Sequence, residues 1–110
     1  MVKRAVVWTQ TAARQRREVL KYWTKRNGSS RYAKKLISLT ADQVEIILSN
    51  PESFKSTTYS GTRESALGHF SIYYQFTSDN LIITSFWDNR QDPKKLLEII
   101  KRDNHSSLEK

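Results

Sequence analysis

A change of hydrophobic period constrains this 110-residue chain more than any other feature. From Tyr32 to Leu48 the apolar residues recur every three or four positions, which is the spacing of an amphipathic helix. From Phe70 to Phe76 they alternate with polar residues, which is the spacing of a strand with one buried face. The sequence therefore predicts long helices and strands within one fold.

A strand and two helices are expected before this change. Residues 4–8 are a β-branched run and predict the strand. A first helix is expected over residues 10–26 and ends at Asn27-Gly28, which is typical of a helix stop. A second helix is expected over residues 30–49, because Asn50-Pro51 pushes the backbone out of the α region. The short connection predicts an antiparallel helical hairpin.

The first helix is predicted to be amphipathic, with one strongly basic side. Its apolar side carries Ala12, Ala13, Val19, Leu20 and Trp23. Its basic side carries Arg14, Arg17, Lys21 and Lys25. Arg16 points near the middle of the apolar side, and we expect its stem to pack while its guanidinium reaches the edge.

Three strands are predicted after the helices. Residues 51–61 are polar and indicate a loop, and strands follow at about residues 62–67, 70–76 and 81–87. The turn at residues 78–80 predicts that they form an antiparallel meander. One face of this sheet is expected to be partly open and to carry His69, Ser71, Tyr73 and Gln75.

A last short helix is predicted to begin at Asp92-Pro93, since proline suits the first helical position. A polar tail, residues 103–110, is expected to fray. The predicted fold class is α+β, with the order β-α-α-β-β-β: a helical hairpin packed on an antiparallel sheet in two layers, plus the short C-terminal helix. At this length we expect a single domain over residues 1–110.

The charge is concentrated at the N-terminal end. The net charge is +8, but residues 1–35 hold eleven Lys or Arg against one acidic residue, Glu18, whereas residues 36–110 have a net charge of −2. Such a surface attracts phosphate backbones or an acidic protein partner. The absence of cysteine excludes disulfides, and the lack of a long apolar run indicates a cytoplasmic protein that does not enter a membrane.

Several classes of site are not expected. With three glycines the chain has no glycine-rich phosphate loop, and no His, Asp or Glu cluster has metal-ligand spacing. We therefore expect no metal and no cofactor.

Short motifs add a resemblance to a known family. Three stretches carry it, in chain order: Val7-Trp8-Thr9 before a basic helix, Arg63-Glu64 followed by Gly68-His69-Phe70-Ser71-Ile72-Tyr73-Tyr74, and Phe86-Trp87-Asp88-Asn89-Arg90-Gln91-Asp92-Pro93. Together with the element order, they resemble the RelE/ParE toxin family of type II toxin–antitoxin systems over about residues 4–97.

The resemblance implies one of two activities. Toxins of the RelE kind cleave mRNA in the ribosomal A site, and those of the ParE kind inhibit DNA gyrase without acting as nucleases. A metal-free nuclease needs an acid, a base and cations at the phosphate. The candidate catalytic residues are Arg90, His69, Arg63, Tyr73 and Glu64, and the candidate nucleic-acid-binding residues are Arg14, Arg17, Lys21, Lys25, Lys94 and Lys95.

One position departs from the family pattern. Ser71 stands where the family often carries an arginine, and serine supplies no fixed positive charge. Each candidate also has a structural alternative. Arg90 can pair with Asp88 or Asp92, Arg63 and Glu64 can form cross-strand or local pairs, and His69 can be a strand-edge residue without a role.

Three functions follow from these observations. The first is a toxin that acts as a metal-independent, ribosome-dependent endoribonuclease (an mRNA interferase). The second is a non-catalytic inhibitor of DNA gyrase, and the third is a degenerate basic domain bound only by its antitoxin. All three predict an acidic antitoxin that folds as it binds.

Overall fold

The structure is a computed structural model that describes residues 3–91, 94–96 and 98. Residues 94–96 and 98 are helical, as expected for a short C-terminal helix. The predicted helix start at Asp92-Pro93 and the tail at residues 103–110 lie outside the described residues. No helix among the described residues is long and apolar enough to cross a membrane.

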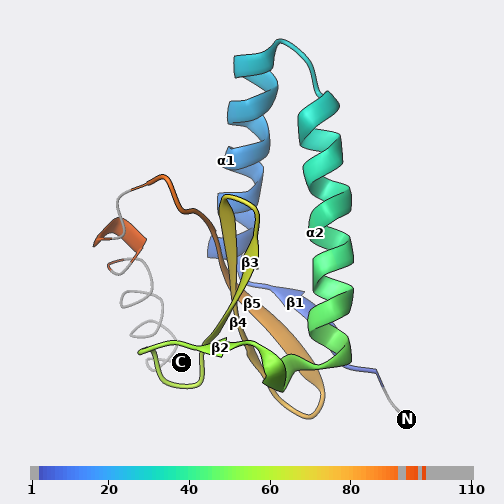
Figure 1. Cartoon of the computed structure of the whole chain (residues 1–110), viewed down its shortest axis with the longest axis vertical. Helices are drawn as coiled ribbons and strands as arrows, with labels where there is room; N and C mark the ends of the chain where they lie inside the picture. The colour runs from blue at the N-terminus through green and yellow to red at the C-terminus, as the bar shows by residue number, and fades with distance from the viewer. Residues whose placement is uncertain (1–2, 92–93, 97, 99–110) are drawn as a thin grey trace.

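The predicted helical hairpin is confirmed (Figure 1). Helix α1 covers Gln10–Asn27 and helix α2 covers Arg31–Ser49. The Thr9 hydroxyl caps α1 by accepting a hydrogen bond from the Ala12 amide at 3.1 Å. Gly28 ends α1 at a φ of 63°, a left-handed conformation in which glycine carries no Cβ penalty.

The sheet has five strands in the order β1-β5-β4-β3-β2. They are β1 (Ala5–Trp8), β2 (Lys55–Ser56), β3 (Arg63–Leu67), β4 (Phe70–Phe76) and β5 (Asn80–Asp88). The meander of β3, β4 and β5 is antiparallel, as predicted.

The prediction of a purely antiparallel sheet is wrong in one pairing, because β1 runs parallel to β5. A parallel pair needs a long crossover, and here the helical hairpin and the first meander strands provide it. The predicted loop at residues 51–61 also contains structure. It holds a 3-10 turn, Pro51–Ser53, and the two-residue strand β2, which pairs with β3 at the sheet edge.

The helices cover one face of the sheet. Their inner sides and that face form the main core, whose fully buried members include Ala12, Ile47, Phe70, Ile72, Tyr74, Leu81, Ile83 and Phe86. Arg16 is half-buried, and its guanidinium lies 4.3 Å from the centre of the ring of Trp8, which packs against this core.

The sequence predicted a partly open second sheet face, but the centre of this face is covered. Ser71 and Tyr73 are only 1% and 8% exposed. Tyr73 packs with Trp87 and Leu96 in a second apolar cluster, which Tyr59 flanks. The C-terminal helix and the loop before β3 thus supply apolar side chains that alternation within one strand could not indicate.

Candidate functional site

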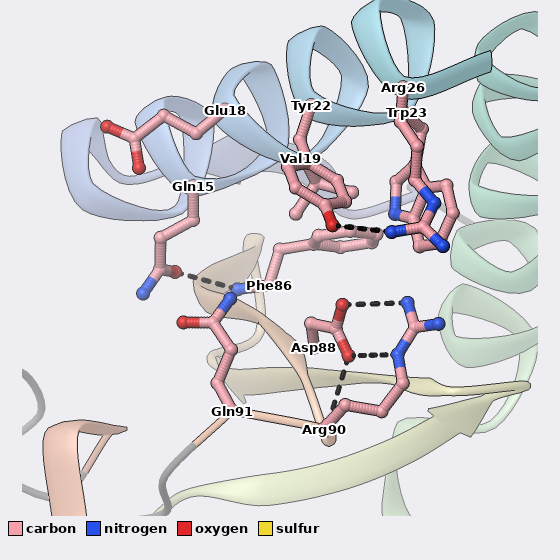
Figure 2. Close-up of a pocket in the computed structure, with 10 residues that line it drawn as sticks. All are labelled: Gln15, Glu18, Val19, Tyr22, Trp23, Arg26, Phe86, Asp88, Arg90 and Gln91. Carbon is pink, nitrogen blue, oxygen red and sulfur yellow. Dashed lines mark hydrogen bonds and ion pairs between the residues drawn. The ribbon is translucent and has the colours of Figure 1, made fainter.

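A groove of about 610 Å³ lies between α1 and the carboxyl end of β5 (Figure 2). Its apolar wall consists of Val19, Trp23 and Phe86. Its polar lining includes Gln15, Glu18, Tyr22, Arg26, Asp88, Arg90 and Gln91. The groove therefore combines aromatic surface with both signs of charge.

Arg90 is fixed at one end of this groove by Asp88. Its Nε and Nη2 donate to the two carboxylate oxygens of Asp88 at 2.8 Å each, and its backbone amide donates to the same carboxylate at 3.0 Å. These hydrogen bonds hold the pKa of Asp88 below its usual value and raise the pKa of Arg90. The structural alternative predicted for Arg90, an ion pair with Asp88, is thus confirmed.

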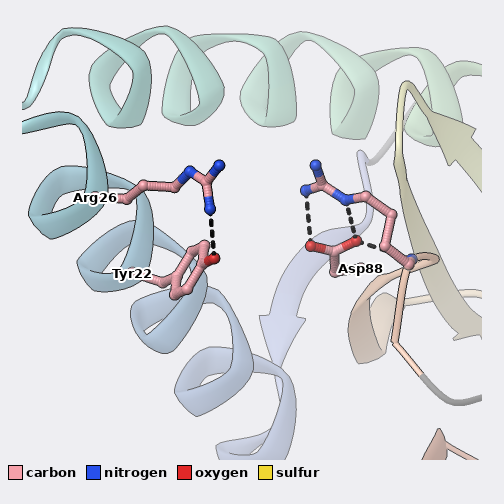
Figure 3. Close-up of polar contacts among 4 residues, drawn as sticks. Tyr22, Arg26 and Asp88 are labelled. Atoms are coloured by element: carbon pink, nitrogen blue, oxygen red, sulfur yellow. Dashed lines mark hydrogen bonds and ion pairs between the residues drawn. The ribbon is translucent and has the colours of Figure 1, made fainter.

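Two arginines share one tryptophan in the groove. The Arg90 guanidinium lies 4.8 Å from the centre of the Trp23 ring, and the Arg26 guanidinium lies 5.5 Å from it. Arg26 also donates to the Tyr22 hydroxyl at 3.2 Å, as Figure 3 shows, with Asp88 across from this pair. Figure 2 shows the two guanidinium groups facing each other across the groove. Cation–π contacts of this kind position each guanidinium without neutralising its charge.

Gln15 joins α1 to β5 at the base of the groove. Its Oε1 accepts from the Phe86 amide at 2.9 Å and from the Ser85 hydroxyl at 3.0 Å. Because the Phe86 amide can only donate, the orientation of the Gln15 amide is determined, and its Nε2 is left as a donor. This Nε2 is buried and has no hydrogen-bond partner among the residues that the structure describes.

A separate polar network lies on the other sheet face. Ser71 Oγ donates to Glu64 Oε2 at 2.8 Å and accepts from Asn89 Nδ2 at 3.0 Å. The Tyr73 hydroxyl donates to the same Glu64 oxygen at 3.3 Å. Burial, reinforced by the Glu64 carboxylate, raises the pKa of Tyr73 to about 12. The phenol is therefore a donor to Glu64 throughout the physiological range.

The structure divides the five candidate catalytic residues between the two faces. Glu64 and Tyr73 lie together on the second face, whereas Arg63, paired in register with the core residue Tyr74, lies on the helix-covered face and donates to the Phe54 carbonyl at 2.8 Å. Arg90 lies in the groove, also on the helix side.

His69 is exposed in the β3–β4 turn. Its charge contributes to the low pKa of Asp88, as the smallest of the causes. Arg63 donates to the Phe54 carbonyl, whereas Glu64 accepts from Ser71 and Tyr73 of the neighbouring strand, which is the cross-strand contact expected for it.

The candidate nucleic-acid-binding residues are all exposed: Arg14, Arg17, Lys21 and Lys25 on α1, and Lys94 and Lys95 in the C-terminal helix. Sequence reasoning missed the groove residues Gln15, Tyr22 and Arg26. Helical spacing places Gln15, Tyr22 and Arg26 along one side of α1, at intervals of seven and four residues, so this signal was available. Among the described residues, no three His, Cys, Asp or Glu side chains come together as a metal ligand set.

Comparisons with known proteins agree with this architecture. The family model for the ParE toxin of the type II toxin–antitoxin system parDE matches residues 6–93. A solved structure described as the chromosomal ParDE toxin–antitoxin system from P. aeruginosa superposes with a TM-score of 0.67 at 17% sequence identity, covering 76% of this chain and 94% of that one. No curated protein matches the sequence.

Proposed function

The chain belongs to the ParE toxin family of type II toxin–antitoxin systems, and we propose that it arrests growth in the cytoplasm by binding and inhibiting DNA gyrase, not by cleaving mRNA. Membership in this family implies an antitoxin partner. The observation that carries the choice of target is the composition of the network around Glu64 and Ser71.

This network lacks what RNA cleavage requires. Attack by a ribose hydroxyl builds negative charge on the phosphorane, which cations must stabilise. Around Glu64 the hydrogen-bond partners are the neutral side chains of Ser71 and Tyr73, and both candidate catalytic arginines lie on the opposite sheet face. A carboxylate held in this way repels a phosphodiester.

The candidate acid–base groups are also poorly matched to the reaction. A general base is most effective when its pKa is near the working pH. With a pKa of about 12, Tyr73 stays protonated near neutral pH. Arg90, the other strong candidate, commits two of its side-chain nitrogens to Asp88.

A binding function uses the surface that the fold leaves exposed. Helix α1 presents Arg14, Arg17, Lys21 and Lys25 to solvent on the side away from the core. A row of cations on a rigid helix accelerates association with an acidic protein surface or with DNA, and salt weakens it. Inhibition by binding needs no reacting group on this surface.

Two assays on the purified protein test the proposal. The first measures ATP-dependent supercoiling of relaxed plasmid by gyrase, and the second maps mRNA ends on translating ribosomes. We expect loss of supercoiling with intact mRNA. The double variant Arg14→Gln/Lys21→Gln should weaken the inhibition, whereas the matched variant Lys34→Gln/Lys35→Gln removes the same charge from exposed positions on α2 and should inhibit like the parent.

Ribosome-dependent mRNA cleavage is the second candidate, favoured by the direct contact of the Tyr73 hydroxyl with Glu64. Its test is Glu64→Gln, which keeps the shape of the side chain and removes the charge. Cleavage of mRNA by the parent that Glu64→Gln abolishes, with gyrase unaffected by either protein, would overturn the gyrase proposal.

A further inference from the structure

We propose that the groove between α1 and β5 is a docking site for an acidic, partly apolar peptide segment of a protein partner. A carboxylate of the segment binds between Arg26 and Arg90, and a backbone carbonyl accepts from Gln15. The inference rests on the chain being one half of a toxin–antitoxin pair, and it does not depend on which enzyme the toxin inhibits.

The arginines supply the anion-binding end. Arg90 uses Nε and Nη2 for Asp88, and Arg26 uses Nη1 for the Tyr22 hydroxyl. Their other guanidinium nitrogens make no hydrogen bond to any residue the structure describes. Within that part of the chain Arg26 also forms no ion pair, so its charge at the groove mouth is uncompensated.

Both arginines are held in position before a ligand arrives. Asp88 and the Trp23 ring fix Arg90, while Tyr22 and the same ring fix Arg26. Two guanidinium groups facing each other repel, and a carboxylate between them relieves that repulsion with charge-assisted hydrogen bonds.

Gln15 supplies an independent indication of a ligand. The residue is 9% exposed, lines the groove and keeps an unpartnered Nε2 whose orientation the Phe86 amide determines. A buried donor without a partner costs stability, and a carbonyl acceptor in the groove removes that cost. Val19, Trp23 and Phe86 lie in the same wall, and they offer an apolar side chain of the segment a surface to cover.

The lining favours a peptide over a nucleic acid. Glu18 and Asp88 also line the groove, so successive phosphates of a strand would meet carboxylates. Two guanidinium groups already lie against Trp23, which leaves less of that ring for a base to stack on. A peptide with one carboxylate beside apolar side chains fits this charge pattern.

The test is an NMR titration of the full chain with three probes. These are the blocked tripeptide acetyl-Leu-Glu-Leu-amide, the same peptide with Gln in place of Glu, and the dinucleotide pTpT. The side-chain signals of the Gln15 amide and the Trp23 indole report directly on the groove. We expect the Glu peptide to shift both signals and the Gln peptide to bind about tenfold more weakly, which corresponds to one charge-assisted hydrogen bond.

Variants connect the response to the groove. Arg26→Gln, which loses the contacts of Arg26 with Tyr22 and Trp23, should weaken the binding of the Glu peptide about tenfold, and Lys34→Gln at an exposed position on α2 should change its affinity less than twofold. Tighter binding of pTpT than of the Glu peptide, equal losses in the two variants, or no shift at Gln15 and Trp23 would each overturn the proposal. Gyrase inhibition by a chain that binds no peptide would leave the proposed function standing.

Discussion

Two buried tyrosines predict a steep loss of stability in mild alkali. Tyr73 and Tyr74 are adjacent in β4 and face opposite layers, yet they are only 8% and 0% exposed. Burial is the main cause that raises the pKa of each to about 12, from 10 in an exposed tyrosine. The protonated phenol is thus the form that the folded state holds.

The sign and the size of this loss in stability follow from the linkage between folding and proton binding. Because the folded-state pKa is raised, the stability associated with each phenol is fully present below pH 10 and is lost as the pH rises through 12. At pH 11 the unfolded chain has already released most of these protons while the folded chain has not. The loss there is about 1.4 kcal/mol per tyrosine, or about 2.7 kcal/mol for the pair.

The assay is urea unfolding at pH 9 and pH 11, compared within each protein. The parent should lose about 2.7 kcal/mol between these values beyond the loss in Tyr73→Phe/Tyr74→Phe, and each single variant should recover about half. Tyr22→Phe is the matched control, since that ring is 55% exposed. All other ionisable side chains are common to the proteins compared, so their contributions cancel.

Tyr74→Phe has a further cost at every pH, because it deletes the hydrogen bond from the Tyr74 hydroxyl to the Pro51 carbonyl at 2.6 Å. Only the difference between the two pH values therefore tests the reasoning. An equal difference in the parent and in the double variant would show that the phenols ionise in the folded state, and the account of both buried layers would be refuted.

Three further outcomes are expected. Asp88→Asn should lower the free energy of unfolding by about 1 kcal/mol at neutral pH. Because folding lowers the pKa of Asp88, its ion pair stabilises the fold when the pH is above the pKa of the unfolded chain, so the variant should lose less stability than the parent below about pH 4. Urea unfolding from pH 2 to 7 measures both effects. Gln15→Leu should cost about 2 kcal/mol, because two buried donors on Ser85 and Phe86 lose their acceptor, and calorimetry showing an unchanged Tm would contradict this. Leu96→Ala should cost about 2–3 kcal/mol by opening a cavity beside Trp87, and a blue-shifted or unchanged tryptophan emission would contradict the packing described.

Much of the fold could be predicted because its signals are local. Helical spacing, Asn27-Gly28 and Asn50-Pro51 indicated the hairpin, and alternation indicated β4 and β5. The parallel partner of β1 could not be predicted in this way, because the hydrophobic periodicity of a strand does not indicate which distant strand it pairs with. For the same reason, alternation assigned Tyr73 to the second face but did not reveal that Leu96 would pack against it.

The candidate site was predicted as a set of residues and not as a geometry. The pairing of Arg90 with Asp88, which was predicted as a structural alternative to a catalytic role, is confirmed. Arg63 and Glu64, however, are neighbours in a strand, so they had to face opposite layers, and alternation alone would have separated them. Arg26 and Gln15 went unnoticed because their significance depends on β5, which joins them only in the folded chain.

The pairing of β1 with β5 also decides when during synthesis the molecule becomes complete. Thr9 contacts Thr84 across 75 residues of sequence, and Gln15 reaches Phe86 across 71. The helical hairpin can form early from local contacts, but these long-range contacts close a large loop and must come late. A nascent chain that stops before β5 therefore carries the basic helix but neither the sheet centre nor the groove, and both take shape only after β5 has been synthesised.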